Sequence, residues 1–509
     1  MRKKEVKMKK IVYLPLDERP CNALFPIRLF GDMFDIAAPS VVGFKKQAVV
    51  WEDLRDFLDR EAPRADGLVL SMDMLLYGGL IPSRLHHLDR ETVMERMDYI
   101  RTLRRKNPSI VIYAYQCIMR CPQYSSSDEE PDYYGECGRE IFLLGEARHR
   151  RQLGLEDGGE EERLSRLVPV EALQDYLDRR AFNLSFNLEA LELVREGVID
   201  ELVFPQDDAA RYGFTAQDQE RVRARISELR LNTRVLLYPG ADELGLTIMS
   251  RILLHFENRR PLVYVKMASV NAASMIPPFE DRPLGETIKY HLISAGCRLA
   301  SSISEAEIVL GVSFPGCDGL DILAAAENVH GYAVERNLIE FLLFLEEALE
   351  RGKVVTLADN AYANGGDPEL ISLLEQKKML GRLHGYAGWN TSSNTMGTAI
   401  AMGVHALIRG ITPAHRNFLA QRYLEDAGYC GKVRTDVMRD DLPRLGYDYY
   451  NIGPQRGEVS ELVGERLRVY VRSEMSSIAE QLEILDVWMP WKRAFEVGLE
   501  IRWNEETKK

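Results

Sequence analysis

The sequence lacks the features that mark membrane, secreted and zinc-binding proteins. No window approaches the roughly 20 consecutive apolar residues of a membrane span. The apolar run at 11–14 is too short for the core of a signal peptide. The seven cysteines are scattered and odd in number, which fits a reducing compartment better than a disulfide framework. We therefore expect a soluble, cytoplasmic protein with no membrane partner.

An excess of positive charge is also lacking. The chain has 65 Lys and Arg residues against 78 Asp and Glu residues, a formal net charge of −13. A nucleic-acid binder needs a basic face to displace counterions from phosphates, so no nucleic-acid partner is expected. The nine histidines are dispersed, and neither a Gly-x-Gly-x-x-Gly motif nor a Walker loop occurs. No cofactor and no metal site is predicted, although Mg²⁺ held by carboxylates alone stays open.

What the sequence does contain is a regular alternation of short apolar runs and amphipathic stretches. Near-continuous apolar strands separated by helices indicate a parallel sheet buried on both faces. Seven such strands before residue 290 favour a (β/α) barrel over an open sheet. They are predicted at 11–16, 35–38, 67–72, 110–115, 201–205, 234–238 and 262–266. We predict an α/β protein with three parts, listed by residue number: a (β/α) barrel-like catalytic domain at 8–290, with a helical insertion around 125–187 that includes the charged segment 156–166; a smaller open α/β domain at 291–420; and a C-terminal α+β segment at 421–509.

Acidic and basic residues recur where the predicted strands end, and ligands of parallel α/β folds bind at those ends. A single acid at such a junction most often just caps the next helix. Five acidic strand ends, four with a nearby arginine, weaken that interpretation. The residues singled out in this way are Asp17, Arg19, Asp73, Arg84, Asp242 and Glu243.

The pair Asp207-Asp208 stands out among these motifs. It follows the predicted strand 201–205, and at a strand terminus both side chains can reach a single pocket. Two carboxyl groups a few ångströms apart do not both ionise easily, so one is pushed toward the protonated form. The pair could supply the acid and the base that glycoside hydrolysis requires, or one acid could orient an attacking acetamido group of the substrate.

The predicted second domain carries two motifs rich in small and polar residues. In one of them, glycines after Asn364 allow close backbone approach to a ligand. The other places Trp389, Asn390 and Thr391 before a helix. An aromatic ring beside amides suits a sugar, and a helix N-terminus suits a phosphate. A buried tryptophan beside an ordinary Thr/Ser helix cap is the competing interpretation.

Together these motifs resemble a bacterial family catalogued as domain of unknown function 4127. The similarity spans about residues 14 to 400, with a weaker echo at 490–496. It rests on Leu-Pro-Leu-Asp-Glu-Arg-Pro (14–20), Ser-Met-Asp-Met-Leu-Leu-Tyr-Gly-Gly-Leu-Ile-Pro-Ser-Arg (71–84), Asp-Asp (207–208), Pro-Gly-Ala-Asp-Glu (239–243), Ala-Asn-Gly-Gly-Asp (363–367) and Tyr-Ala-Gly-Trp-Asn-Thr (386–391). The family label names no activity. Adjacent aspartates at a barrel strand end are also similar to those of substrate-assisted hexosaminidases, an analogy of fold and motif.

We expect a carbohydrate-active enzyme, a glycoside hydrolase of an N-acetylhexosamine-type or related small saccharide. Asp207 and Asp208 are its predicted catalytic residues, and the small saccharide is its expected partner. The predicted substrate-binding residues are Asp17, Arg19, Asp73, Arg84, Asp242, Glu243, Asn364, Trp389, Asn390 and Thr391. Two alternatives remain open: a metal-dependent hydrolase of another small polar molecule, and a sugar-binding protein without catalysis. A homo-oligomer is left open as well.

Overall fold

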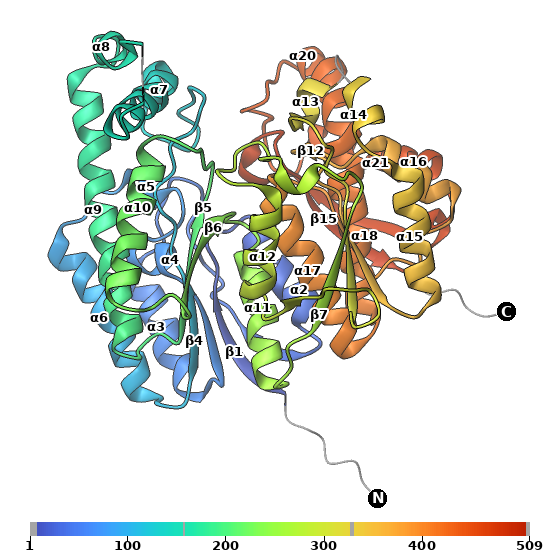
Figure 1. Cartoon of the computed structure of the whole chain (residues 1–509), viewed down its shortest axis with the longest axis horizontal. Helices are drawn as coiled ribbons and strands as arrows, with labels where there is room; N and C mark the ends of the chain where they lie inside the picture. Colours follow the sequence, from blue (N-terminus) through green and yellow to red (C-terminus); the bar gives the residue numbers. More distant parts are fainter. Residues whose placement is uncertain (1–7, 156–157, 326–329, 505–509) are drawn as a thin grey trace, which may run out of the picture. The chain divides into compact units, whose positions relative to one another are not determined.

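The computed structural model describes residues 8–155, 158–325 and 330–504. Glu156 and Asp157, which begin the charged segment 156–166, lie outside the described residues. The chain divides into two compact units (Figure 1). The first contains the residues up to Glu18, Gly31–Ile248 and Phe279–Asp281, and the second contains Arg19–Phe30, Met249–Pro278 and the residues from Arg282 on.

The first unit is built on an open sheet of six strands, all parallel. The order across the sheet is β2-β1-β3-β4-β5-β6. Each predicted strand lies within two residues of an observed one. The strands are β1 (Lys9–Leu14), β2 (Phe34–Ala37), β3 (Gly67–Ser71), β4 (Val111–Tyr115), β5 (Glu201–Gln206) and β6 (Val235–Pro239).

Helices connect these strands, and several of them lie on one side of the sheet in Figure 1. That placement follows from the right-handed connection of parallel strands, which sends successive crossovers to the same face. The main helices are α3 (Trp51–Glu61), α4 (Met72–Tyr77), α5 (Pro82–Leu85), α6 (Arg90–Lys106), α10 (Phe214–Glu228) and, crossing into the second unit, α11 (Leu244–Phe256). The predicted insertion contains α7 (Tyr134–Gln152) and α8 (Glu160–Ser165), and α9 (Val170–Arg195) extends beyond it.

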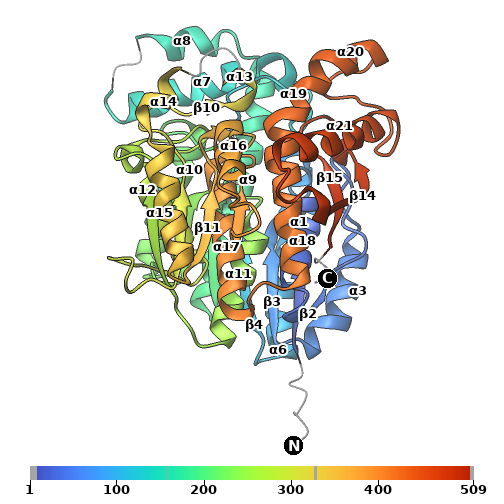
Figure 2. The same ribbon diagram turned by 90° about the vertical axis from the view of Figure 1, so that its right-hand side faces the viewer.

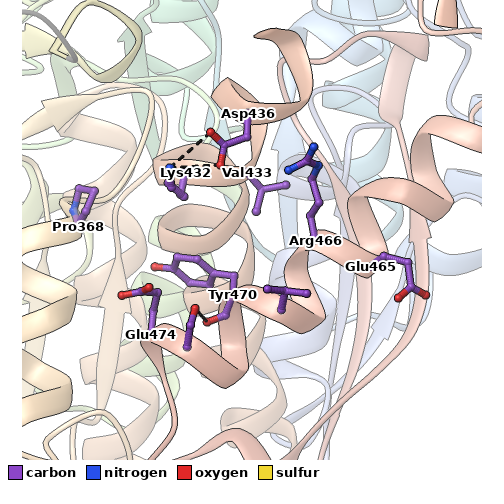
Figure 3. A pocket seen from close by; sticks show the side chains of 10 residues that line it. Pro368, Lys432, Val433, Asp436, Glu465, Arg466, Tyr470 and Glu474 are labelled. Carbon is purple, nitrogen blue, oxygen red and sulfur yellow. Dashed lines mark hydrogen bonds and ion pairs between the residues drawn. The ribbon is translucent and has the colours of Figure 1, made fainter. Parts of the chain in front are cut away.

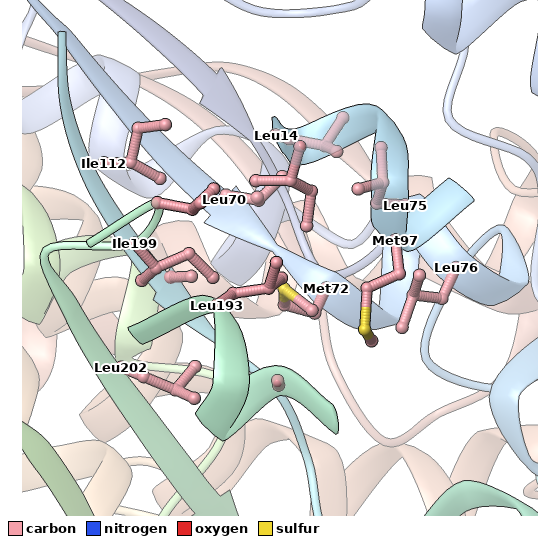
Figure 4. Packing of buried hydrophobic residues seen from close by; sticks show 14 of the residues in the cluster. Leu14, Leu70, Met72, Leu75, Leu76, Met97, Ile112, Leu193, Ile199 and Leu202 are labelled. Carbon is pink, nitrogen blue, oxygen red and sulfur yellow. The ribbon is translucent and has the colours of Figure 1, made fainter. Parts of the chain in front are cut away.

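An apolar core holds the sheet to this helical layer. Leu14, Leu70, Ile112 and Leu202 come from four strands and gather with Leu193 of α9, among other residues (Figure 4). All five side chains are fully buried. Because parallel strands buried on both faces need apolar residues at nearly every position, their sequences are continuous apolar runs.

The second unit contains a five-stranded parallel sheet in the order β13-β11-β9-β7-β8. Numbered along the chain, this is the doubly wound order 2-1-3-4-5, which the first sheet also follows through its first five strands. The strands are β7 (Leu262–Met267), β8 (Arg298–Leu299), β9 (Ile308–Val312), β11 (Val354–Ala358) and β13 (Gly385–Ala387). A short two-stranded pair, β10 (Leu320–Asp321) with β12 (Tyr362–Ala363), accompanies it.

Helices cover both faces of this second sheet. Gly311 of β9 lies against α15 through Phe341, whereas Gly403 of α17 lies against Thr356 of β11. Because neighbouring residues of a strand face opposite ways, the registers of Gly311 and Thr356 put α15 and α17 on opposite faces. The helices are α1 (Pro20–Ala23), α2 (Phe25–Phe30), α12 (Leu284–Ser294), α13 (Ile322–Ala325), α14 (His330–Glu335), α15 (Leu338–Glu350), α16 (Pro368–Gln376), α17 (Ser392–Arg409) and α18 (Pro413–Arg422).

The C-terminal part begins with an unusual backbone. A π-helical segment covers Tyr423–Val433, and a second one covers Val437–Asp441. π-Helices normally occur as single-turn bulges, frequently at functional sites. The helix α21 (Glu458–Glu474) then packs beside the antiparallel hairpin of β14 (Leu482–Trp488) and β15 (Gly498–Trp503) (Figure 2). None of the helices in the described part of the chain combines the length and hydropathy of a membrane span.

The predicted barrel is wrong. Both parallel sheets are open, with edge strands β2 and β6 in the first and β8 and β13 in the second. The predicted seventh strand, β7, pairs with β8 and β9 rather than with β6. The longest segment of the first unit, Gly31–Ile248, ends before the domain boundary predicted at residue 290. The α/β class is confirmed.

Replacing Leu70 by alanine tests the packing of the first core. Leu70 is fully buried, so Leu70→Ala is expected to lower the free energy of unfolding by about 3 kcal/mol through lost burial and the cavity left behind. Urea denaturation measures this loss. Leu153, half exposed at 50%, is the matched control, and Leu153→Ala should cost less than about 1 kcal/mol. Equal effects of the two changes would contradict the proposed core.

Candidate functional site

The predicted acidic residues of the first unit lie at one edge of its sheet. Asp17 follows β1, Asp73 follows β3, Asp207 comes directly after β5, and Asp242 follows β6. All these strands are parallel, so their carboxyl ends share an edge. Strand order reverses between β1 and β3, which is where open α/β sheets form ligand crevices.

Two buried arginines organise the acids at this edge. Arg84 of α5 and Arg120, which follows β4, are both bridged by Glu129 and by Glu130. Glu130 Oε1 accepts from Arg120 Nε at 2.7 Å and from Arg84 NH1 at 3.2 Å. Asp207 Oδ2 completes the cluster, accepting from Arg84 NH2 at 2.9 Å and from Arg120 NH1 at 3.1 Å. The arginines thus neutralise carboxylates that would otherwise repel one another.

Long-range hydrogen bonds hold Arg120 in place. The hydroxyl of Tyr176 and the guanidinium of Arg180, both on α9, donate to the Arg120 carbonyl oxygen at 3.0 Å. On the other side of the cluster, Lys46 Nζ donates to the Glu130 carbonyl oxygen at 3.2 Å. The predicted insertion therefore contributes to the geometry of the cluster through α9.

Asp208 differs from Asp207 in its surroundings. Its Oδ2 accepts from Arg120 NH1 at 3.0 Å, and its backbone has φ +45°, a strained value for a non-glycine residue. Burial raises the pKa of Asp208 to about 7; the Arg120 charge opposes that rise and the Asp207 charge adds to it. The side chain of Asp207 is 17% exposed, and that of Asp208 is 11% exposed. The pair therefore includes a carboxyl group that can hold a proton near neutral pH.

Asp73 and Glu243 are buried carboxyl groups at the same edge. Asp73 Oδ2 accepts from the Cys117 backbone N–H at 2.8 Å, and burial raises its pKa to about 6. Glu243 Oε2 accepts from the Ala241 backbone N–H at 2.9 Å, and burial raises its pKa to about 8. The Glu243 side chain folds back over Gly240, where a Cβ would lie 2.3 Å from Oε1. Glu243 is consequently a neutral hydrogen-bonding acid at pH 7.

The remaining predicted residues belong to the second unit. Arg19, Asn364, Trp389 and Asn390 line one cavity of about 20 Å³, space for about one water molecule. Asn364 N–H donates to the Asn390 carbonyl oxygen at 2.7 Å, and both asparagines have positive φ. The structure thus brings together four residues that the sequence motifs singled out.

Thr391 and Trp389 instead match the competing interpretation for their motif. Thr391 is the N-cap of α17, and its side chain accepts from the Asn394 backbone N–H. The Trp389 indole is buried and donates to Thr398 Oγ1 at 3.2 Å. Both side chains therefore have structural roles in the start of α17.

Three members of the acid–arginine cluster were not among the predicted site residues. Arg120 follows the fourth predicted strand, but no acid accompanies it there, so it was not assigned to the site. Glu129 and Glu130 come some ten residues later, in a loop rich in serine and acid, where no strand-end signal applies. Across the described residues, no group of three or more His, Cys, Asp and Glu side chains has the arrangement of a metal site.

The raised pKa of Glu243 predicts how stability depends on pH. The folded-state value of about 8 lies above the unfolded value of about 4.3. The protonated carboxyl group of Glu243 favours the folded state. This contribution to the free energy of unfolding is complete below about pH 4 and is lost as the pH rises toward 8, because ionisation of the carboxyl group favours the unfolded chain. Glu243→Gln cannot ionise, so at pH 8 it is expected to be more stable than the wild type by roughly 4–5 kcal/mol, with little difference at pH 4.5.

Thermal unfolding at several pH values checks this expectation. Glu95→Gln, a change at an exposed position of α6, is the control and should parallel the wild type throughout. A Glu243→Gln protein that loses stability between pH 5 and 8 as steeply as the wild type would show that this carboxyl does not carry the effect.

Removing Arg120 should destabilise the first unit strongly. Arg120→Met removes the one guanidinium that pairs with all four carboxyl groups of the cluster, which is expected to cost about 3–5 kcal/mol of unfolding free energy. Arg101, whose ion pairs with Asp98 and Glu196 lie at the surface, is the matched control; Arg101→Met should cost no more than about 1 kcal/mol. Chemical denaturation compares the two. A loss for Arg120→Met as small as that of the control would contradict the assigned role.

Comparison with known proteins places these motifs in one family. A family model described as a protein of unknown function, DUF4127, matches residues 11–500. A comparison with curated proteins finds no significant match. The match takes in the acidic strand ends of the first unit and the two motifs of the second, and it reaches past the similarity of about 14 to 400 expected from the motifs. The chain belongs to the DUF4127 family.

Proposed function

We propose that the protein is an enzyme that hydrolyses a glycosidic bond by acid–base catalysis at Asp207 and Asp208. In this proposal protonated Asp208 donates a proton to the leaving-group oxygen. Asp207, held by Arg84 and Arg120, is the partner carboxylate that acts as nucleophile or orients an attacking acetamido group of the substrate. The observation that carries the proposal is the shared contact of both aspartates with one guanidinium nitrogen.

That shared contact limits the separation of the two acids. Asp207 Oδ2 and Asp208 Oδ2 each lie within 3.1 Å of Arg120 NH1, so they are no more than about 6 Å apart. Inverting glycosidases need a wider gap to admit a water molecule between their carboxyl groups. The spacing supports a retaining or a substrate-assisted mechanism.

The surroundings of the pair also support this reaction class. A carboxyl group whose pKa lies near 7 is suited to general acid catalysis at neutral pH. Burial at the same edge also raises the pKa of Asp73 to about 6 and that of Glu243 to about 8, so protonated carboxyl groups gather near the proposed acid. Two buried guanidinium groups disfavour a divalent cation at this place, which weighs against the metal-dependent alternative. We include an N-acetylhexosamine-type substrate in the proposal on the analogy of the paired aspartates alone, because both sheets are open and form no barrel.

Asp208→Asn tests the role of the proposed acid. The change keeps the shape and removes the proton, so kcat on a panel of aryl glycosides that includes N-acetylhexosaminides is expected to fall at least 100-fold. Wild-type activity should decline as the pH rises through about 7, because the acid form of Asp208 is then lost. That alkaline limb should be absent from the residual activity of the variant.

Asp200→Asn is the matched control at the opposite end of β5. Asp200 also pairs with an arginine, Arg104, at 2.6 Å, but it lies far from the carboxyl edge of the strand. Its replacement should leave kcat within about twofold of the wild type. Undiminished activity of Asp208→Asn, or no turnover of any glycoside by the wild type, would overturn the proposal.

A further inference from the structure

The second unit contains a cavity beside its π-helical segment. It has a volume of about 420 Å³, within the range of small-molecule sites. The π-helical segment Tyr423–Val433 and α21 form its two walls, and Pro368 at the start of α16 closes one side (Figure 3). The acid–arginine cluster of the first unit contributes nothing to its lining.

Close packing of the two helical segments shapes this cavity. A Cβ on Gly428 of the π-helical segment would lie 3.0 Å from Leu467 and 3.3 Å from the Tyr470 ring. Glycine at this position therefore lets α21 approach. Further along, the π-helical segment presents Val433 while α21 presents Val469, which is 61% exposed. The result is an apolar trough with Tyr470 at its base.

The charges around the cavity are unevenly paired. Most of the lining ions already have partners, as in Lys432–Asp436 at 3.2 Å, Arg466–Asp441 at 2.6 Å and Glu465–Arg468 at 3.0 Å. Glu474 is different: it forms no ion pair or hydrogen bond with any residue that the structure describes. Its carboxylate lies near the Tyr470 hydroxyl in Figure 3. The charge of the cavity that has no partner among the described residues is therefore negative, on the exposed side chain of Glu474.

Two further features favour a cation at the same place. Ser473 and Glu474 form the last turn of the 17-residue helix α21, whose C-terminal carbonyl groups carry partial negative charge. The face of Tyr470 attracts cations as well. The C-terminal end of α21, the Glu474 carboxylate and the Tyr470 ring thus all favour a cation at one place beside the apolar residues of the cavity.

We propose that this cavity binds a small organic amine. Its ammonium group lies between Glu474 and Tyr470, and its apolar body packs on Val433, Val469 and Pro368. This assignment is independent of the glycosidase proposal, since it involves no residue of the first unit.

Three indoles that differ only in the charge of the side chain test the proposal by calorimetry on the full chain. Tryptamine carries an ammonium, tryptophol is neutral and indole-3-acetate is an anion. Tryptamine is expected to bind at least tenfold more tightly than tryptophol, and indole-3-acetate most weakly. Glu474→Gln should reduce tryptamine binding to the level of tryptophol and leave tryptophol unchanged.

Two more variants separate the cavity from a general charge effect. Glu461→Gln removes an exposed carboxylate from the first turn of the same helix and should leave all three affinities unchanged. Val469→Arg fills the trough from an exposed position, so the protein should stay folded while binding of all three indoles is lost. Equal binding of tryptamine and tryptophol, no binding of tryptamine at millimolar concentration, or unchanged binding in Glu474→Gln would each overturn the proposal.

Discussion

The ion pairs of Arg120 are the constraint on which the carboxyl edge of the first sheet depends. Four acidic side chains meet there within hydrogen-bonding distance of two guanidinium groups. Removing so many charges from water is unfavourable unless each is paired. With Asp208 protonated, three carboxylates face two guanidinium groups, so the cluster keeps a net charge of −1. The side chains of Asp207 and Asp208 are both partly exposed. Burial and charge excess together raise the pKa of Asp208, so this property of the pair originates in the network around it.

Sheet topology explains why residues so distant in sequence meet. Parallel strands deliver every following loop to one edge, and the doubly wound order places the reversal between β1 and β3. Both sheets follow this order, although no internal repeat is evident in the sequence. The physical reason is that packing helices on two faces of a parallel sheet has few right-handed solutions, so unrelated apolar patterns arrive at the same arrangement.

The local structure could be predicted from the sequence far better than the pairing of strands. Apolar runs located β3, β5 and β6 within a residue or two, because burial on both faces leaves a strong signal. The assignment of β7 to the first sheet failed because its partner, β9, is selected by packing over long sequence distances. The π-helical segment at 423–433 also gave no signal, since its hydrogen bonds do not follow the period of 3.6 residues. Glu129 and Glu130 were missed for a similar reason: only the folded loop brings them to Arg84.

The glycines of the motif Ala-Asn-Gly-Gly-Asp show how one sequence signal can serve packing instead of a ligand. A Cβ on Gly366 would lie 2.2 Å from the Tyr386 hydroxyl and 3.0 Å from Asp359 Oδ2. Asp359 is already saturated by protein donors: Ser313, Tyr386 and the Asp367 backbone N–H. Asp426 in the π-helical segment accepts in the same way from the Gly388 N–H and from Arg422. Carboxylates whose lone pairs are engaged inside the protein hold loops together. Chemistry is better sought at Asp207-Asp208, where strain and partial exposure coincide.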